Sequence, residues 1–444
     1  MGAHLAEIHP FRGLRYQVGL VDDLGKVISP PYDVISPEEQ RALLARSPYN
    51  VVRLECGEQR PEDADDDNRY TRAAATLAQW LSSGVLAPDE HPSFYVYDQE
   101  FEHDGKRYRR RCLLTRVRLE EWAEGTIRPH EHTLAQPKRD RLSLLRACRA
   151  NFSPVLALYG DPDGAIARTL EQAVADAGPV AVAEQDSERH TLWAIADPAT
   201  HRRLQERFAP LKLYIADGHH RYETALNYRD ERRAAAASWT GEEPENFVLL
   251  GLTAAEDPGL LVLPIHRLAH LPEDDDVVLE RLGRYLTVEE LPQPLDDEAA
   301  LPRLFSLIAE RGKSATAFGL CLSGSKRPYL LTIEDAETIV QRLCPECPAE
   351  WRSLDVAVLH FALLGMILRV DPDPIEEGGS VTTIADARRA CEEARAGRYS
   401  AAFLLNPARL DQILSLADAG RRMPRKSTMF HPKLATGLVI NRLE

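Results

Sequence analysis

The segment with the clearest chemical content is the run DGHHR, residues 217–221. It directly follows an apolar stretch typical of a β-strand and opens a stretch typical of a helix. A helix N-terminus presents free backbone N–H groups and the positive end of the helix dipole, both of which attract anions. Gly218 allows a tight turn, His219, His220 and Arg221 add donors, and Asp217 can hold Mg²⁺ or accept a proton. The pattern favours a phosphate-binding turn over its structural alternatives, a surface turn or a buried polar network.

A second polar group begins in RPHEHT, residues 128–133. His130 and His132 flank Glu131 as in a metal site, but on a helix the two rings would point to different faces, so only a strand or loop would bring them together. Glu131, Lys138 and Arg141 form an alternative phosphate or Mg²⁺ site. A capped helix start with solvated charges is the structural alternative.

A third group lies in the loop MPRKSTMFHPK, residues 423–433. It contains Arg425, Lys426, Ser427, Thr428 and Lys433. Residues 419–442 include six basic side chains and no acidic ones, which makes this segment a local attractor of anions in an acidic protein. Lys followed by Ser-Thr resembles the end of a phosphate-binding loop, but the glycines of G-x-x-x-x-G-K are missing, so a Walker fold is not supported.

The run Pro30-Pro31-Tyr32-Asp33 predicts a rigid turn that presents a phenol and a carboxylate before a helix. Arg53 and Glu55 follow on what we interpret as a short strand. We therefore include Tyr32, Asp33, Arg53 and Glu55 among the candidate binding residues, although turn chemistry alone also explains the prolines.

The elements that must position these residues alternate between helices and strands. Ser36, Pro37 and Glu39 predict a capped helix start, and a second helix is expected from about Asn68. Asp104-Gly105 between two β-rich runs predicts a hairpin. The chain therefore reads as a mixed α+β protein.

The polar stretch 237–246 is the best boundary, because alternating helix and strand patterns restart after it. We predict a phosphate-binding domain over residues 1–236 and a C-terminal α/β domain over residues 247–444 that carries the basic KST loop. In the second domain we expect helices at 301–310, 353–368 and 384–396, and a final strand at 437–440.

Composition excludes several classes of protein. The 444 residues include 54 Lys and Arg against 69 Asp and Glu, a formal charge of −15, which argues against a nucleic-acid coat. The longest apolar run, 356–368, is too short to span a bilayer, and the N-terminus lacks a signal pattern. Seven cysteines make no disulfide framework, and the single Cys344-x-x-Cys347 pair is a weak zinc or redox hypothesis. We expect a cytoplasmic protein without nucleic-acid or membrane partners.

Several segments together resemble one bacterial and archaeal family, domain of unknown function 1015. They are PPYDVIS, NVVRLE, HEHT with KRDRLSLL, ADGHHRYETA, SLDVAVLH and MPRKST with HPK, and the resemblance extends over nearly the whole chain. ADGHHR is also similar to the DGHHR of free serine kinases in the ParB/sulfiredoxin superfamily. The resemblance implies a ParB/sulfiredoxin-like phosphate-binding core, enlarged by insertions, and a phosphotransferase that makes O-phospho-L-serine.

The same resemblance implies a phosphate donor, which for this larger architecture is expected to be pyrophosphate, with ATP or ADP as alternatives, and Mg²⁺ as cofactor. Asp217, His219, His220 and Arg221 match the kinase motif and inherit donor phosphate and Mg²⁺ binding. The early glutamate that supplies the base in such kinases has three candidate counterparts here, Glu55, Glu131 and Asp33.

From these expectations we assign roles to the candidate residues. The catalytic candidates are Asp217, Glu131 and His220, and the metal candidates are Asp217 and Glu131. The phosphate-binding candidates are His219, His220, Arg221, Lys138, Arg141, Lys426, Ser427, Thr428 and Lys433. The substrate-binding candidates are Tyr32, Asp33, Arg53, Glu55 and His130.

Two other functions remain open at this point. A ParB-type module would bind a nucleotide and change shape without consuming serine. A metal-dependent hydrolase would use His130, Glu131, His219 and His220 to hold a transition metal.

Overall fold

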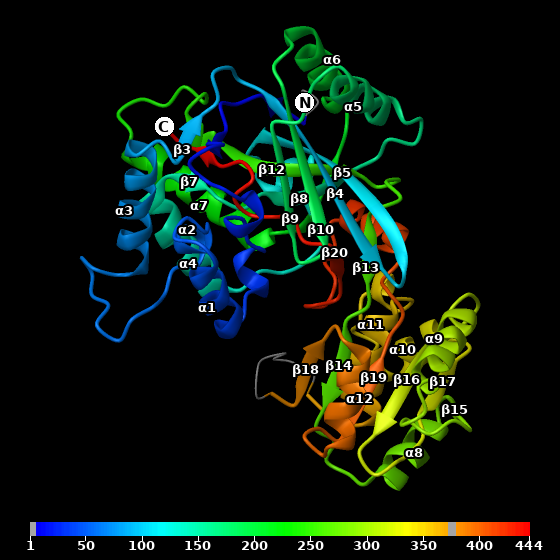
Figure 1. Ribbon diagram of the computed structural model, residues 1–444. Helices are drawn as coiled ribbons and strands as arrows, with labels where there is room; N and C mark the ends of the chain where they lie inside the picture. Colours follow the sequence, from blue (N-terminus) through cyan, green and yellow to red (C-terminus); the bar gives the residue numbers. More distant parts are fainter. Residues whose placement is uncertain (1–5, 372–378) are drawn as a thin grey trace. The chain divides into compact units, whose positions relative to one another are not determined.

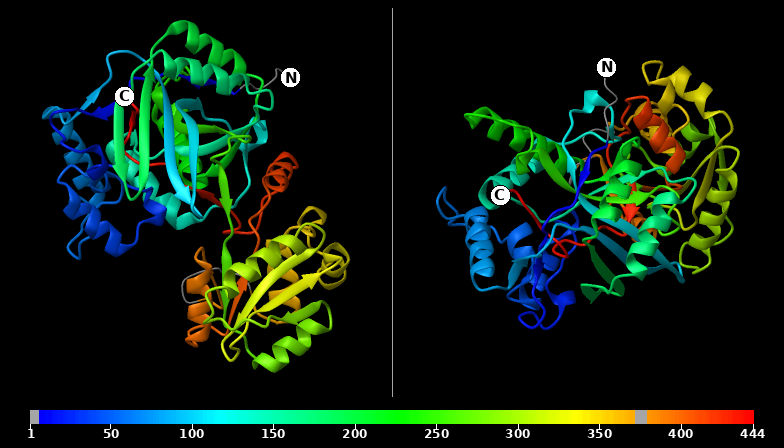
Figure 2. Two further views of the ribbon diagram at one scale, coloured as in Figure 1. Left: turned by 45° about the vertical axis from the view of Figure 1, so that its right-hand side comes forward. Right: turned by 90° about the horizontal axis from the view of Figure 1, so that it is seen from above.

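The structure, a computed structural model, describes residues 6–371 and 379–444, and the chain divides into two compact units. Unit 1 contains the chain up to Pro129, Thr133–Leu261 and Pro432–Glu444, and unit 2 contains His130–His132 and Val262–His431. Figure 1 shows the chain coloured along its sequence, and Figure 2 gives two further views. Each unit has its own sheet, so each is described by itself.

Unit 1 is built on a nine-stranded mixed sheet. Its strands are β1 (Ile8–His9), β4 (Phe94–His103), β5 (Lys106–Arg118), β6 (Ile127–Pro129), β8 (Val155–Tyr159), β9 (Ala181–Gln185), β10 (Glu188–Ile195), β11 (Leu213–Asp217) and β12 (Phe247–Ala254). The order is β6-β11-β8-β12-β5-β4-β10-β9, with β1 beside β5. β11 runs parallel to β6, and β12 runs parallel to β8, while the other neighbouring strands along this path are antiparallel.

The helices of unit 1 are α1 (Pro37–Arg46), α2 (Val52–Glu55), α3 (Arg69–Ser82), α4 (Ala135–Cys148), α5 (Ala165–Ala175), α6 (Pro198–Phe208) and α7 (His219–Ala235). All of these except α1 contribute to two larger apolar clusters. α5 and α6 lie side by side (Figures 1 and 2) and, with α7, share a core with the sheet. α2, α3 and α4 share a second cluster around Trp80 and Leu144. The short strands β2 (Leu14–Tyr16), β3 (Leu86–Pro88), β7 (Ala150–Asn151) and β21 (Asn441–Arg442) form two small two-stranded sheets in this unit.

Local sequence explains where several of these elements begin. Ser36 caps α1 by accepting a hydrogen bond from the Glu39 N–H, as predicted. α3 begins close to the predicted start, and Asn68 caps it. Asp104 and Gly105 both have positive φ at the tip of the predicted β4–β5 hairpin. β8 and β12 are apolar along nearly their whole length because they are buried inside the sheet.

Unit 2 is built on a six-stranded sheet whose pairings are all antiparallel in the described part of the chain. Its strands are β14 (His266–Ala269), β15 (Thr287–Glu290), β16 (Thr316–Leu322), β17 (Tyr329–Ile333), β18 (Val381–Ile384) and β19 (Ala401–Leu404), in the order β15-β17-β16-β19-β14-β18. Its helices are α8 (Asp275–Gly283), α9 (Ala300–Arg311), α10 (Ala336–Leu343), α11 (Asp355–Ala357), α12 (Ala387–Arg395) and α13 (Leu410–Asp418). A π-helix, Val358–Ile367, continues α11, and β13 (Leu261–Leu263) pairs with β20 (Met429–His431).

Four expectations need correction. The boundary lies after Leu261, because Phe247–Ala254 is an interior strand of the first sheet, and the last residues, Pro432–Glu444, return to unit 1. The second unit is α+β, because its sheet is antiparallel. The predicted strand carrying Arg53 and Glu55 is the short helix α2. The final strand is Asn441–Arg442, later than predicted.

Two further findings bear on the classes of protein considered above. Cys321 of β16 and Cys391 of α12 form a disulfide in unit 2, with Cα atoms 5.7 Å apart, whereas we expected no disulfide framework. Among the described residues, we find no helix long and apolar enough to cross a membrane.

Candidate functional site

The DGHHR run lies where predicted, at the turn from β11 into α7. Gly218 has a φ of 90°, in the left-handed region that favours glycine. A Cβ at this position would lie 2.9 Å from Nε of Arg221. The backbone conformation therefore favours glycine here, and any side chain would have to displace the Arg221 guanidinium.

Asp217 is the centre of this turn, and its side chain is 14% exposed. One carboxylate oxygen accepts from the Lys433 ammonium group and the other accepts from Nη2 of Arg221 at 2.6 Å. Burial opposes ionisation, but the charges of Lys433 and Arg221 outweigh it and hold the pKa of Asp217 well below its usual range. Asp217 is therefore ionised at physiological pH and is a poor proton acceptor. The three groups together leave one net positive charge at the start of α7, and we call them, with residues 217–221, the Asp217 turn.

The two histidines of the turn have different surroundings. His219 is buried and contributes to the electrostatic field at Asp217. Nε2 of His220 accepts a hydrogen bond of 2.8 Å from the backbone N–H of Leu134, just before α4, so this nitrogen is unprotonated. The α4–α7 contact thus fixes the orientation of the His220 ring.

Lys138 does not join the cations of the turn. Its ammonium group lies 2.9 Å from Oε2 of Glu223, which also accepts from Thr133. Glu223 was not among our candidates, although it lies within the ADGHHRYETA segment, in the second turn of α7. Lys138 is thus partly neutralised by a carboxylate on α7.

The loop with Tyr32 and Asp33 lies close to the Asp217 turn. Residues Tyr32–Val34 form a single 3-10 turn after Pro30-Pro31. Asp33 is exposed, and its charge acts on Lys433 and on Arg221. The structure therefore brings one accessible carboxylate of the predicted substrate-binding group within electrostatic reach of both cations.

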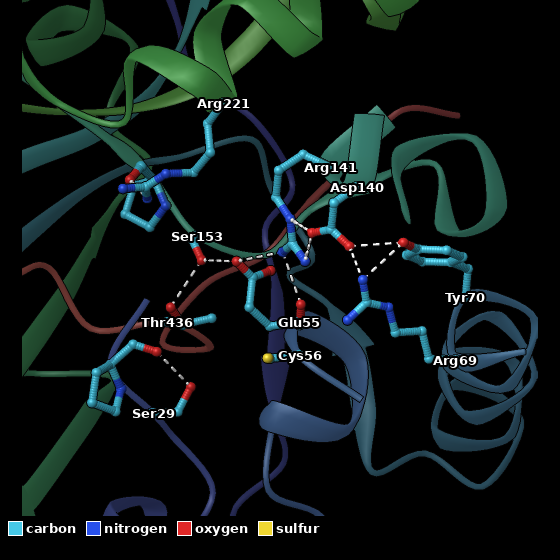
Figure 3. A network of polar contacts seen from close by, with 12 residues as sticks. Ser29, Glu55, Cys56, Arg69, Tyr70, Asp140, Arg141, Ser153, Arg221 and Thr436 are labelled. Carbon is cyan, nitrogen blue, oxygen red and sulfur yellow. Dashed lines mark hydrogen bonds and ion pairs between the residues drawn. The ribbon is translucent and has the colours of Figure 1, made fainter. Parts of the chain in front are cut away.

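Glu55 lies inside unit 1 rather than at its surface. It is 4% exposed, its Oε1 accepts from Ser153 Oγ at 2.6 Å, and Nη1 of Arg141 lies 3.3 Å from the same oxygen (Figure 3). Burial raises the pKa of Glu55, and Arg141 and Ser153 offset this only in part. With Arg141, Ser153 and Arg221 it lines a small pocket of about 40 Å³.

Arg141 and Arg53 are directed toward protein groups. Arg141 donates to Asp140 and to the backbone carbonyl of Glu55, and is buried to 7% exposure. The Arg53 guanidinium donates to the carbonyl of Leu44 in α1, so it serves to join two helices.

The remaining candidates gather in unit 2. The backbone N–H of Met423 donates to the carbonyl of His130 at 2.7 Å, and the N–H of Lys426 donates to Oε1 of Glu131 at 2.7 Å. Nε2 of His130 lies 2.9 Å from Oγ1 of Thr428. The last two contacts join residues that are 295 and 298 positions apart in the sequence, so two distant segments of the chain meet here.

The KST loop, residues 426–428, is held by its backbone. Arg267, fully buried, donates to the carbonyl of Lys426 at 2.8 Å, and Ser427 donates to the carbonyl of Pro424. The Lys426 side chain is exposed, and its backbone has a φ of 53°. Arg267 was not a candidate, because a single arginine in an apolar strand gives no signal of a partner 159 residues away.

The hydrolase hypothesis requires a preformed transition-metal site. In residues 6–371 and 379–444 we find no group of three or more His, Cys, Asp or Glu side chains arranged to hold a metal ion. Cys344 and Cys347 carry free thiols.

Comparisons with known proteins give a family and a few distant structures. A family model described as "Protein of unknown function (DUF1015)" matches residues 8–357. No curated protein matches the chain. A conserved hypothetical protein from Pyrococcus furiosus is 14% identical, with 70% of this chain and 92% of that chain covered and a TM-score of 0.32.

Two further structures are similarly distant. A free serine kinase in complex with AMP is 14% identical, with 70% of this chain and 89% of that chain covered and a TM-score of 0.33. SbnI with a C-terminal truncation, from Staphylococcus aureus, is 11% identical, with 74% and 87% covered and a TM-score of 0.35.

Proposed function

The chain belongs to the DUF1015 family, and from that premise we propose that it is a phosphotransferase that transfers a phosphoryl group to the hydroxyl of free L-serine. The observation that carries this proposal is the Asp217 turn. A helix start, a glycine in the left-handed backbone conformation, and two cations around one carboxylate suit a bound phosphate group. The similarity of ADGHHR to the motif of free serine kinases is the reason for proposing L-serine as the acceptor of the phosphoryl group.

The transferred group carries negative charge, and catalysis of such transfers depends mainly on positioning and electrostatic stabilisation. We assign donor phosphate binding to Arg221, Lys433 and the first backbone N–H groups of α7. For unit 2, taken by itself, we assign Lys426, Ser427 and Thr428 to the binding of an anionic group, a phosphate or a carboxylate.

Within unit 1, we assign the role of the base that accepts the serine hydroxyl proton to Asp33, which is exposed and acts electrostatically on Lys433 and Arg221. Asp217 does not suit this role, because its lowered pKa makes it a weak base. Glu55 does not suit it either, because it is buried and is enclosed by Ser153 and Arg141.

Asp217 is also a poor Mg²⁺ ligand in this arrangement. Each of its oxygens is bonded to a cationic side chain, and a divalent ion would meet the repulsion of Lys433 and Arg221. Mg²⁺ dependence therefore stays a prediction, and the roles assigned above involve only groups of this chain.

Phosphorus NMR of the full chain with L-serine tests the proposal. Pyrophosphate, our first choice of donor, is offered beside ADP and ATP in separate samples, each with and without Mg²⁺. We expect a new phosphomonoester signal that requires serine. Intact donors in every sample, with a chain that is folded by circular dichroism, would reject the proposal.

Two isosteric variants then identify the base. Asp33→Asn should lower the turnover number by about 10²–10⁴-fold. Glu131→Gln, in unit 2, should keep most of the activity. Equal, small effects of both would show that neither carboxylate is the base.

A further inference from the structure

We infer that Arg141 is a positioning residue, which holds the Tyr32–Asp33 loop so that Asp33 stays within electrostatic reach of the two cations of the Asp217 turn. This inference rests on the proposed function for its kinetic consequence. Its structural part, the fixing of the loop, can be tested without any activity.

The Arg141 guanidinium is committed to protein groups in three directions. Nε and Nη2 point to Oδ2 of Asp140, at 2.7 and 2.5 Å, and Nη1 points to the carbonyl of Glu55 at 2.8 Å. Its flat face covers the Tyr32 ring, with Cζ 3.9 Å from the ring centroid. Such a group is poorly placed to bind a donor phosphate, which was its predicted role, and well placed to hold a ring.

A chain of polar contacts leads from Arg141 through Glu55 and Ser153 to Thr436 (Figure 3). Glu55 accepts from Ser153, and Ser153 lies 2.9 Å from the hydroxyl of Thr436. The backbone of Thr436 pairs with that of Ser29 through bonds of 2.8 and 3.2 Å. Ser29 is followed by Pro30-Pro31 and then by Tyr32, so the ring of contacts returns to Arg141.

The Tyr32–Asp33 loop is therefore held at two places, at its start and at the Tyr32 ring. Thr436 holds its start by backbone hydrogen bonds, two prolines stiffen its entry, and Arg141 covers the ring at its tip. Lys433 stands three residues before Thr436, and its carbonyl accepts from Gln99 at 3.0 Å. The segment from Lys433 to Thr436 thus contacts the start of the loop and also carries one of the two cations on which Asp33 acts.

Arg141 is itself anchored to α3 through Asp140. Asp140 accepts from Tyr70 at 2.7 Å and also pairs with Arg69, both on α3 (Figure 3). These contacts neutralise the Asp140 carboxylate and restrict the orientation of the Arg141 guanidinium plane. A lysine at this position would keep the charge but lose the planar fork and the broad contact with Tyr32.

Hydrogen exchange of Arg141→Lys tests the structural part. The amides of Val34 and Ile35 are bonded across the 3-10 turn, to the carbonyls of Pro31 and Tyr32, so they report directly on the loop. We expect at least tenfold faster exchange in a peptide covering these residues. Arg146→Lys is the matched control, because Arg146 lies on the same helix in an exposed pair with Glu231. Unchanged exchange in Arg141→Lys would overturn the inference.

A double-mutant cycle tests the kinetic part. Arg141→Lys should lower kcat/KM for serine on the order of a hundredfold, as expected for a displaced reacting group. The same substitution in an Asp33→Asn background should have almost no further effect on the rate, whereas a merely structural role would give additive losses. Additive losses would overturn the inference.

A second variant guards against simple unfolding. Tyr32→Leu removes the ring that Arg141 covers and leaves the contacts of Arg141 with Asp140 and Glu55 intact. It should accelerate the exchange of the Val34 and Ile35 amides as Arg141→Lys does, and it should show the same non-additivity with Asp33→Asn. If the wild-type chain phosphorylates no serine, the proposed function fails while the exchange result still decides the loop. If it is active and Tyr32→Leu frees the loop without changing the rate, only the positioning role fails.

Discussion

The Asp217 turn of unit 1 and the KST loop of unit 2 are both candidate anion sites, but they are built differently. At the turn, charged side chains are largely buried and paired with one another, and Asp217 lies between Lys433 and Arg221. At the loop, backbone groups are bonded to Glu131, His130 and Arg267, and the Lys426 side chain reaches solvent.

The difference lies in what each site contributes to folding. Breaking a buried pair leaves an uncompensated charge, so the residues of the turn are needed for stability as well as for chemistry. An exposed side chain such as Lys426 contributes little to stability, whatever it binds. Substitutions at the two sites should therefore separate stability from activity.

The largest effect is expected from Asp217→Asn. It leaves Lys433 and Arg221 without their common carboxylate and should lower the free energy of unfolding of unit 1 by about 3–5 kcal/mol. Urea denaturation followed by tryptophan fluorescence measures this, since Trp80, Trp122, Trp193 and Trp239 are in unit 1.

Glu231→Gln is the matched control for Asp217→Asn. Its pair with Arg146 lies on the same helix, α7, but is exposed, so the change should be below about 1 kcal/mol. A similar loss in both variants would remove the distinction between buried and exposed pairs.

Lys426→Ala should have the opposite profile. We expect turnover to fall on the order of a hundredfold, as for the loss of one stabilising donor, and stability to change by less than about 0.5 kcal/mol. Lys326→Ala, also exposed in unit 2, serves as the control and should leave both quantities unchanged. A loss of stability as large as that of Asp217→Asn would contradict the contrast between the two sites.

The sequence was informative where the relevant contacts are local. The Ser36 cap, the start of α3 near Asn68, the Asp104-Gly105 hairpin and the strand–turn–helix at 217–221 depend on neighbours in the chain, and each was predicted near its observed place. The turn residues were recognised because a glycine between a strand and a helix has few other uses.

Long-range pairing could not be derived from sequence alone. Nothing in the sequence around Lys433 indicates that it pairs with Asp217, 216 residues away. Likewise, nothing around Arg141 indicates that its guanidinium packs on the Tyr32 ring. The boundary was placed too early for the same reason, because the apolar strand 247–254 gives no sign of the sheet to which it belongs. Arg53 was included by proximity to Glu55 on a predicted strand, but the segment is a helix turn that directs it toward Leu44.

A largely buried carboxyl in each unit extends the comparison to pH. Asp217 has cationic partners, and its pKa is lowered. Asp355 of unit 2 is hydrogen-bonded to the neutral side chains of Thr316 and Asn406, and burial raises its pKa to about 6. Burial alone favours the protonated form, so the nature of the partner decides the sign.

The smallest of the three effects follows from that sign. The unfolded chain loses the Asp355 proton near pH 4, before the folded chain does, so the stability of unit 2 falls as the pH rises from about 4 to about 6 and is then constant. We expect a loss of about 2 kcal/mol, measured by the hydrogen-exchange protection of β16 and β19 between pH 4 and pH 7. Asp355→Asn, which cannot ionise, should remove this slope. Asp217 acts in the opposite direction, because its contribution is present above about pH 4 and is lost only as the pH falls further, so a slope that persists in Asp355→Asn would have to come from another group of unit 2.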